Sequence, residues 1–328
     1  FGHHFLRRGS RRLPQRALAY IQGLYTASKS NMERMDESLE STNEQSLHYL
    51  INDADWDHQA VLDDFARSAD RVIGGSDDTC LLIDETYFAK KGKMSSGVAR
   101  QWNGRLGKTD NCQVGVFAAL CRDCYAVPID CRLYLPTEWT ESPKRLSKAK
   151  VPDEHRGFLT KTQIAMTQIE RAIENDMQFA WVSVDGGYEK SPEFVRKMDD
   201  MGVQFFADVH KSQRIFLTEP KPEASPRGKK LRVEEQSVRL DRWLEKQGDE
   251  QWTLGEVRQG AKGPIRVRYR RLQAWLWDNK AQEAAARPVT FVITQMPDGT
   301  DTKYCLTNAP ADLASEVLIY RQRQRFWV

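Results

Sequence analysis

The sequence predicts a mixed α/β fold, in which helices flank one mixed sheet, an all-α domain comes first and a β-rich insertion precedes the last helix. Three observations favour it. Helical periodicity without strand-like runs extends to about residue 72. From residue 80 onwards, short apolar strand-like runs alternate with amphipathic helices, and beyond residue 250 several strand-like runs follow one another directly. A chain of 328 residues has room for more than one such domain.

The first predicted domain, residues 1–76, is helical. Leu13, Ala17, Ile21 and Leu24 recur at helical spacing, and Ser28, Asn43 and Asp57 are suitable N-caps for later helices. Two short helices at 32–40 and 44–51 fit a helix-turn-helix, although such pairs also meet in bundles that do not touch DNA. We assign this domain to DNA binding or dimerisation.

The second predicted domain, residues 77–210, contains the mixed sheet. Its expected strands and helices follow in the order β-β-β-α-β-α-β, at 80–84, 113–120, 125–134, 161–175, 179–185, 192–201 and 203–209. Three antiparallel strands followed by alternating helix and strand is the order of an RNase H-like domain. In that fold, acidic residues of the first and fourth strands meet at one edge of the sheet.

The remaining residues form the predicted insertion, 211–309, and the start of a final core helix, 310–328. Strand-like runs at 252–258, 265–277, 289–295 and 304–307 interrupt the α/β alternation. The helical pattern of the last segment reaches Val328 without a breaker, so we expect the polypeptide to continue beyond it.

Asp84 ends the first predicted strand and Asp185 ends the fourth. Two-metal phosphoryl transfer needs carboxylates that hold two Mg²⁺ ions about 3.5 to 4 Å apart, and the strand order above brings these two together. Taken singly, Asp84 is explained equally well as a strand-end cap, and Asp185 as a turn former before Gly186 and Gly187. Their joint placement favours catalytic metal ligation.

Charge and composition narrow the partners. The net charge is only +3, but basic residues cluster at 7–16, 226–232, 262–271 and 321–325, which favours nucleic acid over a merely solvated surface. Neither an apolar run of about 18 residues nor a secretory signal is recognisable, so we expect an intracellular protein that binds no membrane. The cysteines are expected to be reduced, and Cys121 and Cys124 flank a hairpin turn rather than half a zinc site.

Several separate motifs carry a family resemblance. The segments 83–93 (IDETYFAKKGK), 97–101 (GVARQ) and 111–116 (NCQVGV) resemble the first-aspartate block of bacterial insertion-sequence transposases of the DDE superfamily. Asp185 to Tyr188 resembles the second-aspartate block, and 133–136, 138–139 and 151–154 are similar to the family as well. The resemblance covers nearly the whole chain.

This resemblance implies an RNase H-like enzyme that depends on Mg²⁺, with Mn²⁺ able to replace it. It implies cut-and-paste movement of double-stranded DNA from terminal inverted repeats into target DNA, by a homodimer assembled on DNA at the bacterial nucleoid in the cytoplasm. The family's third acidic ligand is a glutamate that follows a block resembling 323–328, so it would come directly after Val328. Glu316, the acid in the final helix, lies about three turns too early.

Other residues have smaller expected roles. Lys90, Lys91, Lys93 and Arg100 flank the first aspartate and are candidates for phosphate contacts, with a solvated loop as the alternative. Glu85 is not expected to be a ligand, because neighbouring side chains of a strand point to opposite faces. Further DNA-contact candidates are Arg323 and Arg325, and base-stacking candidates, for which core packing is the alternative, are Trp252, Trp275 and Trp277.

We therefore predict a DNA transposase in which Asp84 and Asp185 hold Mg²⁺. One alternative keeps the fold without the chemistry, as a domesticated, catalytically inactive DNA-binding protein. A second keeps cleavage without strand transfer, as a structure-specific RNase H-like nuclease.

Overall fold

The computed structural model describes residues 1–6, 12–40, 42–188, 192–221, 233, 236–260, 263–279 and 282–324. By internal contacts the chain divides into two units, Phe1–Ala69 and Asp70–Val328, and the division falls within helix α4 (His58–Ile73). We describe each unit by itself.

The first unit is all helical where it is described. It contains a short 3₁₀ helix and three α-helices before α4: η1 (Gly2–Phe5), α1 (Leu13–Thr26), α2 (Met32–Ser38) and α3 (Glu44–Asn52). The side chain of Asn43 accepts a hydrogen bond from the Ser46 amide at 2.8 Å, and Asp57 accepts one from the Ala60 amide at 3.0 Å. Both helix starts are those that the sequence predicts. The third predicted N-cap, Ser28, is wrong, because Asn31 caps α2 by accepting a hydrogen bond from the Arg34 amide at 2.9 Å.

A small apolar core holds these helices together. Leu13 and Ala17 of α1 are buried against Leu50 of α3, and Phe5 and Trp56 pack against the same cluster. Helices α1 and α2 also approach closely, because a Cβ on Gly23 would lie 2.9 Å from the Met35 side chain. Glycine at position 23 therefore permits the contact.

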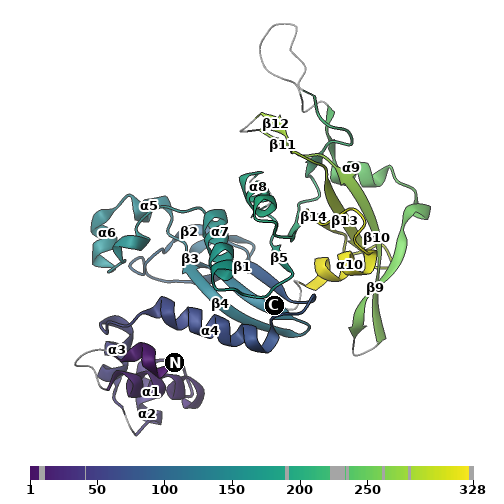
Figure 1. Ribbon diagram of the computed structural model, residues 1–328. Helices are drawn as coiled ribbons and strands as arrows, with labels where there is room; N and C mark the ends of the chain where they lie inside the picture. Colours follow the sequence, from purple (N-terminus) through teal and green to yellow (C-terminus); the bar gives the residue numbers. More distant parts are fainter. Residues whose placement is uncertain are drawn as a thin grey trace. The chain divides into compact units, whose positions relative to one another are not determined.

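The second unit is organised around one large sheet of ten strands (Figure 1). Its strands include β1 (Cys80–Ala89), β2 (Ala99–Asn103), β3 (Lys108–Arg122), β4 (Tyr125–Leu133), β5 (Trp181–Val184), β6 (Phe205–Asp208), β9 (Thr253–Gly260), β10 (Gly263–Ala274), β13 (Val289–Gln295) and β14 (Lys303–Thr307). Short pairs are formed by β7 (Arg214–Ile215) with β8 (Val238–Arg239) and by β11 (Trp277–Asp278) with β12 (Glu283–Ala284). The helices are α5 (Thr137–Thr140), α6 (Pro143–Lys148), η2 (Asp153–His155), α7 (Lys161–Glu174), α8 (Pro192–Asp200), α9 (Leu240–Glu245), η5 (Asp249–Gln251) and α10 (Ser315–Gln324).

One half of this sheet has the RNase H-like arrangement. Strand β3 pairs antiparallel with β4 and β1, and β5 and β6 follow in parallel to β1. The predicted mixed α/β fold, with a mixed sheet flanked by helices, is confirmed.

The other half extends the same sheet. Strand β14 pairs antiparallel with β6, and β13, β10 and β9 follow in that order. The strands predicted for the insertion therefore continue the sheet by backbone hydrogen bonds. How this unit is subdivided stays a prediction.

Helices cover both faces of the sheet. Helix α7 lies on one face, where Gln168 donates a hydrogen bond to the Val116 carbonyl at 3.0 Å and Arg171 forms an ion pair with Asp130 of β4 at 3.0 Å (Figure 1). On the other face, Leu318 and Ile319 of α10 belong to the buried cluster that also holds Leu82 of β1 and Trp181 of β5, the latter in edge-to-face ring contact with Tyr320 of α10. Fully burying side chains of this size contributes about 1.5 to 3 kcal/mol each.

A satellite core fixes the segment between β1 and β2. Trp139 is 1 % exposed and donates its ring N–H to the Val98 carbonyl at 2.8 Å, while the Arg145 guanidinium lies 4.0 Å above its ring. Gly97 has φ +73, and a Cβ there would lie 2.8 Å from the Tyr134 carbonyl oxygen. The motif around residues 133–139 thus has a structural role, because it packs on the start of β2.

All six cysteines are free thiols, and Cys121 and Cys124 flank the hairpin turn between β3 and β4, where Asp123 has φ 54. Burial raises the pKa of the Cys121 thiol to about 12. Within the described ranges, no helix combines the length and the apolar character that a membrane span needs.

Candidate active site

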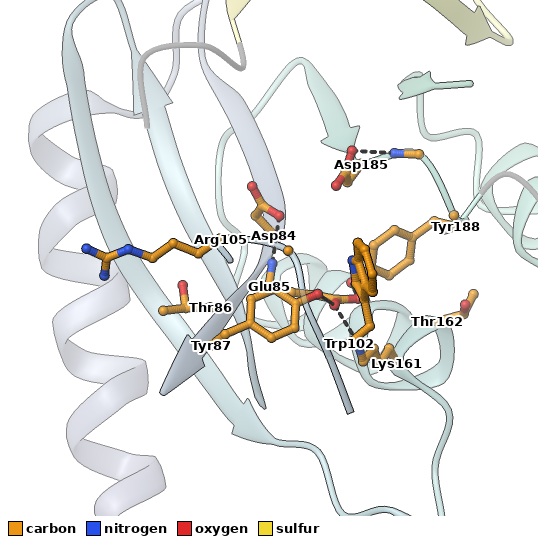
Figure 2. A pocket seen from close by; sticks show the side chains of 13 residues that line it. Asp84, Glu85, Thr86, Tyr87, Trp102, Arg105, Lys161, Thr162, Asp185 and Tyr188 are labelled. Carbon is orange, nitrogen blue, oxygen red and sulfur yellow. Dashed lines mark hydrogen bonds and ion pairs between the residues drawn. The ribbon is translucent and has the colours of Figure 1, made fainter. Parts of the chain in front are cut away.

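Strands β1 and β5 place two aspartates next to each other, Asp84 within β1 and Asp185 directly after β5. The prediction that the first strand ends at Asp84 is wrong, because β1 continues to Ala89. These strands pair in parallel with Ile83 opposite Val184, and the backbones of paired strands lie roughly 4.8 Å apart. The next residues on the two strands are Asp84 and Asp185. Alternation puts Asp84 on the same face as Leu82, the face that α10 covers, and the register puts Asp185 there too. Both line one pocket with a volume of about 670 Å³ (Figure 2).

Each carboxylate is held by the backbone that follows it. The Glu85 amide donates to Asp84 Oδ1 at 2.7 Å, and the Gly186 amide donates to Asp185 Oδ1 at 2.6 Å (Figure 2). A Cβ on Gly186 would lie 3.3 Å from the Asp208 carbonyl oxygen, and Gly187 has φ +143. The two glycines therefore allow the tight turn that orients Asp185.

Glu85 is the centre of a second cluster in the same pocket. Its carboxylate accepts hydrogen bonds from the Tyr87 hydroxyl at 2.7 Å and from the Tyr188 hydroxyl at 3.3 Å. The Lys161 ammonium forms an ion pair with it at 2.5 Å. Figure 2 shows these side chains gathered below the two aspartates. The negative charge of Glu85 is thus balanced by the Lys161 ammonium inside the pocket.

Both tyrosines remain protonated at neutral pH. Burial raises the pKa of Tyr87, and the hydrogen bond to Glu85 raises it further. Burial also raises the pKa of Tyr188, with added contributions from the negative charges of Glu85, Asp84 and Asp185. Their hydroxyls therefore act as donors in a pocket where negative charge accumulates.

Glu85 enters the pocket although it follows Asp84 directly in a strand. The pairing of β1 with β5 ends at Ile83, whereas β1 itself continues to Ala89. Beyond Ile83 the pocket reaches around the edge of β1, so side chains from both of its faces line it. Neighbouring side chains of β1 still point to opposite faces. Because β5 no longer pairs with β1 beyond Ile83, both faces border the same pocket there, so Asp84 and Glu85 both line it.

The remaining lining comes from α7 and from the β2–β3 hairpin. Lys161 is the first residue of α7, and Thr160 and Gln163 form a capping box at that end. The hairpin contributes Gly104, Arg105 and Trp102, whose side chain is 58 % exposed at the pocket. The lining therefore includes an exposed aromatic ring, that of Trp102, and the cationic side chains of Lys161 and Arg105.

Sequence comparison identifies the family to which this chain belongs. A family model described as DDE superfamily endonuclease matches residues 1–264. The chain belongs to the DDE superfamily of endonucleases. The chain is also similar to a probable transposase for insertion sequence element IS701 from Microchaete diplosiphon, with 26 % identity over 178 residues. The match covers 53 % of this chain and 43 % of that relative, so it spans less than half of the relative's length.

The predicted DNA contacts of this DDE superfamily member do not line the pocket where they are described. Lys90, Lys91, Lys93 and Arg100 are exposed, the three lysines on the loop after β1 and the arginine on β2. Arg323 is largely buried and contacts Asp301 at 3.1 Å and Thr294 at 2.9 Å. Arg325 lies outside the described residues. The roles of all six in DNA binding stay predictions.

The three tryptophans predicted for base stacking are half-buried and do not line the pocket either. Trp252 lies against two guanidinium groups, those of Arg268 at 5.0 Å and Arg270 at 4.8 Å. Trp275 forms an isolated bridge with Phe216, and Trp277 pairs with Ala284. Their stacking role also stays a prediction.

Several residues that line the pocket are not predicted from the sequence. Lys161 could have been found from its place after Thr160, which starts a helix with Gln163 three residues later. Trp102 lies in β2 and Arg105 in the turn that follows it, a segment for which the sequence predicts no strand. Glu316, the alternative acid in α10, is exposed and does not line the pocket.

Proposed function

We propose that this protein is a transposase that cuts double-stranded DNA at the terminal inverted repeats of a transposon and joins the freed ends to target DNA. The observation that supports it most is the placement of Asp84 and Asp185 on or directly after the adjacent strands β1 and β5, where both line one pocket. Membership of the DDE endonuclease superfamily and similarity to a probable IS701 transposase add to this support.

The residues of the pocket fit Mg²⁺. Its acidic centre offers carboxylate oxygens, which are the ligands that Mg²⁺ prefers, and backbone amides already fix Asp84 and Asp185 in place. When bound there, two Mg²⁺ ions would help to activate the attacking oxygen and to stabilise the leaving oxygen. Asp84 and Asp185 would hold them, and Mn²⁺ offers similar ligand chemistry.

Cationic groups of the pocket would contact the DNA backbone. Lys161 is placed by Glu85, so its ammonium can meet a phosphate beside the carboxylates. Arg105 and the exposed ring of Trp102 stand on the hairpin at the rim, where the ring offers a stacking surface. Lys90, Lys91, Lys93 and Arg100 would extend the phosphate contacts along the neighbouring loop and strand.

The test is a cleavage and joining assay on a terminal-repeat duplex, with and without Mg²⁺. We expect wild type to cut and join only with the metal. Asp185→Asn should lower the cleavage rate at least about a hundredfold, because removing even an outer partner of a metal site costs roughly 10- to 100-fold. The matched control is Asp200→Asn, an exposed acid at the end of α8 that does not line the pocket and should cleave like wild type.

The outcomes separate the alternatives. Cleavage without joining would identify a structure-specific nuclease, and terminal-repeat binding without cleavage would identify an inactive DNA-binding protein. Equal cleavage by Asp185→Asn and wild type would refute the metal assignment. Light scattering of the DNA complex would test the proposed dimer, because one complex should then hold two protein chains.

A further inference from the structure

A cluster of possible metal ligands lies in the first unit, far along the chain from Asp84 and Asp185. His3 and His4 belong to η1, and Asp64 belongs to the part of α4 in the same unit. Asp64 Oδ2 lies 3.1 Å from His4 Nε2 and 3.8 Å from His3 Nε2. Each of the three offers one ligand atom, and these atoms all lie within 4.8 Å of one another.

These separations suit a single ion. Zinc–nitrogen and zinc–oxygen bonds of roughly 2.0 to 2.2 Å at tetrahedral angles place neighbouring ligand atoms about 3.3 to 3.5 Å apart. The His4–Asp64 separation of 3.1 Å, which is a hydrogen bond in this structure, lies just below this range, and the His3–Asp64 separation of 3.8 Å lies just above it. The His3 side chain is 65 % exposed, so it can turn toward an ion without displacing core residues.

The short helix that carries the histidines is anchored on both sides of them. The Phe1 ring lies 6.4 Å from the ring of Phe65, which neighbours Asp64 in α4. On the other side, the Phe5 ring lies 5.1 Å from the Trp56 ring and packs on the core of the unit. His3 and His4 are therefore held beside Asp64 by packing that does not depend on the histidine–aspartate contacts themselves.

The ligand types select the class of metal. Imidazole nitrogen suits Zn²⁺, Ni²⁺ and Co²⁺, whereas Mg²⁺ prefers oxygen ligands. We propose that His3, His4 and Asp64 form a binding site for one divalent transition-metal ion, with Zn²⁺ as the best match, that fastens η1 to α4. Three protein ligands leave a fourth position for water. The site uses different residues and a different metal class from the pocket at Asp84 and Asp185.

The binding of Zn²⁺ to the metal-free protein tests this site by titration calorimetry. Excess Mg²⁺ is present throughout so that hard-metal sites are occupied. We expect one Zn²⁺ per chain at this site, and at least a tenfold weaker affinity in His4→Ala and in Asp64→Asn. His48→Ala is the matched control, since His48 lies in the same unit on α3 and faces Glu44 instead. It should bind Zn²⁺ within about twofold of wild type.

Two further measurements keep the result decisive. Asp185→Asn should retain the Zn²⁺ uptake, which separates this site from the acidic pocket. X-ray absorption of the zinc-loaded wild-type protein should show two imidazole ligands, and it needs no variant to fold. The proposal is overturned if wild type takes up no Zn²⁺, if His4→Ala and Asp64→Asn bind it as wild type does, or if the bound zinc has thiolate ligands or only oxygen ligands.

Discussion

Lys161 is the cation that lies deepest in the acidic pocket. Its ammonium contacts Glu85 at 2.5 Å and lies 5.4 Å from the Tyr87 ring and 5.7 Å from the Tyr134 ring. A lysine fixed in this way can stabilise the negative charge of a phosphate during phosphoryl transfer.

We expect Lys161→Ala to lower the rate of DNA cleavage by about tenfold or more, because the phosphate loses a charged contact. Lys161→Arg should retain much of the rate, since it keeps the charge. Single-turnover cleavage of a terminal-repeat duplex measures both. Lys197→Ala, which removes an exposed lysine on α8, is the control and should cleave like wild type. An unaffected Lys161→Ala variant would remove Lys161 from the proposed site.

Tyr188 should make the free energy of unfolding fall at alkaline pH. Because its pKa is raised by burial and by nearby carboxylates, it stays protonated in the folded protein while an unfolded tyrosine ionises above about pH 10. Its contribution is therefore fully present below that pH and is lost as the pH rises above it. At pH 11 the loss relative to pH 8 should be about 1.4 kcal/mol.

Urea unfolding at pH 8 and pH 11 measures this loss. The free energy of unfolding should fall less between the two pH values in Tyr188→Phe than in wild type. Tyr25→Phe, which alters an 88 % exposed tyrosine, should show the same fall as wild type. Equal falls in all three proteins would contradict the assignment.

The sequence predicts that Asp84 and Asp185 follow short runs of buried residues on two strands, because such a change of polarity is visible in the sequence itself. Only Asp185 follows the end of its strand, since β1 continues beyond Asp84 to Ala89. The role of Glu85 was not predictable in the same way. It depends on β5 ending at Val184 while β1 continues, and the length of a neighbouring strand is a tertiary property.

At the level of elements, the start of α7 connects stability to the pocket. The Thr160 hydroxyl accepts a hydrogen bond from the Gln163 amide at 3.2 Å, and the Gln163 side chain accepts one from the Thr160 amide at 2.9 Å. Lys161 follows Thr160 directly, so this capping box also fixes the backbone that carries the pocket lysine.

We expect Thr160→Ala to lower the free energy of unfolding by about 1 kcal/mol, because the helix loses its cap. The cleavage rate should fall as well, since the first turn of α7 frays. Thr160→Ser retains the hydroxyl and should be close to wild type in both respects. Urea unfolding and the cleavage assay measure the two effects. Full cleavage by a destabilised Thr160→Ala variant would separate the cap from the site.

Strand β2 of the β2–β3 hairpin is an element that the sequence does not predict. Ala99 and Asn103 are the buried residues of β2, and the residues between them are polar or exposed, so the strand carries little apolar pattern. It is formed by pairing with β3 and by packing of the neighbouring Val98 against Trp139. The pairing with β3 is local but leaves no apolar pattern, and Trp139 lies 41 residues from Val98 in the sequence, which explains why periodicity did not reveal the strand.

At the scale of the whole second unit, the single sheet should couple distant parts. Every residue of β13 is buried, and the pairing runs from β13 through β14 and β6 to β5 and β1. We expect Phe291→Ala in β13 to cost about 3 to 5 kcal/mol. Because the strands share one hydrogen-bonded network, protection should fall in β1 and β5 as well as in β13.

Hydrogen exchange followed by mass spectrometry measures that protection strand by strand. Leu254→Ala in β9 is the control, because Leu254 is 58 % exposed and its removal creates no core cavity. It should leave protection of β1 and β5 unchanged. Loss of protection confined to β13 and its immediate neighbours in Phe291→Ala would show that the two halves of the sheet open separately.

The sequence predicted the strands of the second half of this unit but not the sheet to which they belong. Val289–Gln295 and its neighbours show clear strand patterns, and their bounds agree closely with the structure. The connection depends on a short register in which Cys305 lies opposite Asp208 and Thr307 opposite Phe206. Three such pairs leave no distinctive trace in composition, so a separate β-rich insertion was the simplest expectation.

A sheet of this width does not remain flat. Adjacent strands rotate by roughly 20 to 25° each, and six steps separate β1 from β9, so the strand direction should turn by roughly 120 to 150° across the molecule. A straight DNA duplex that runs parallel to the strands near β1 would then cross the strands near β9 at a steep angle. A duplex that runs parallel to the strands at both places would have to bend.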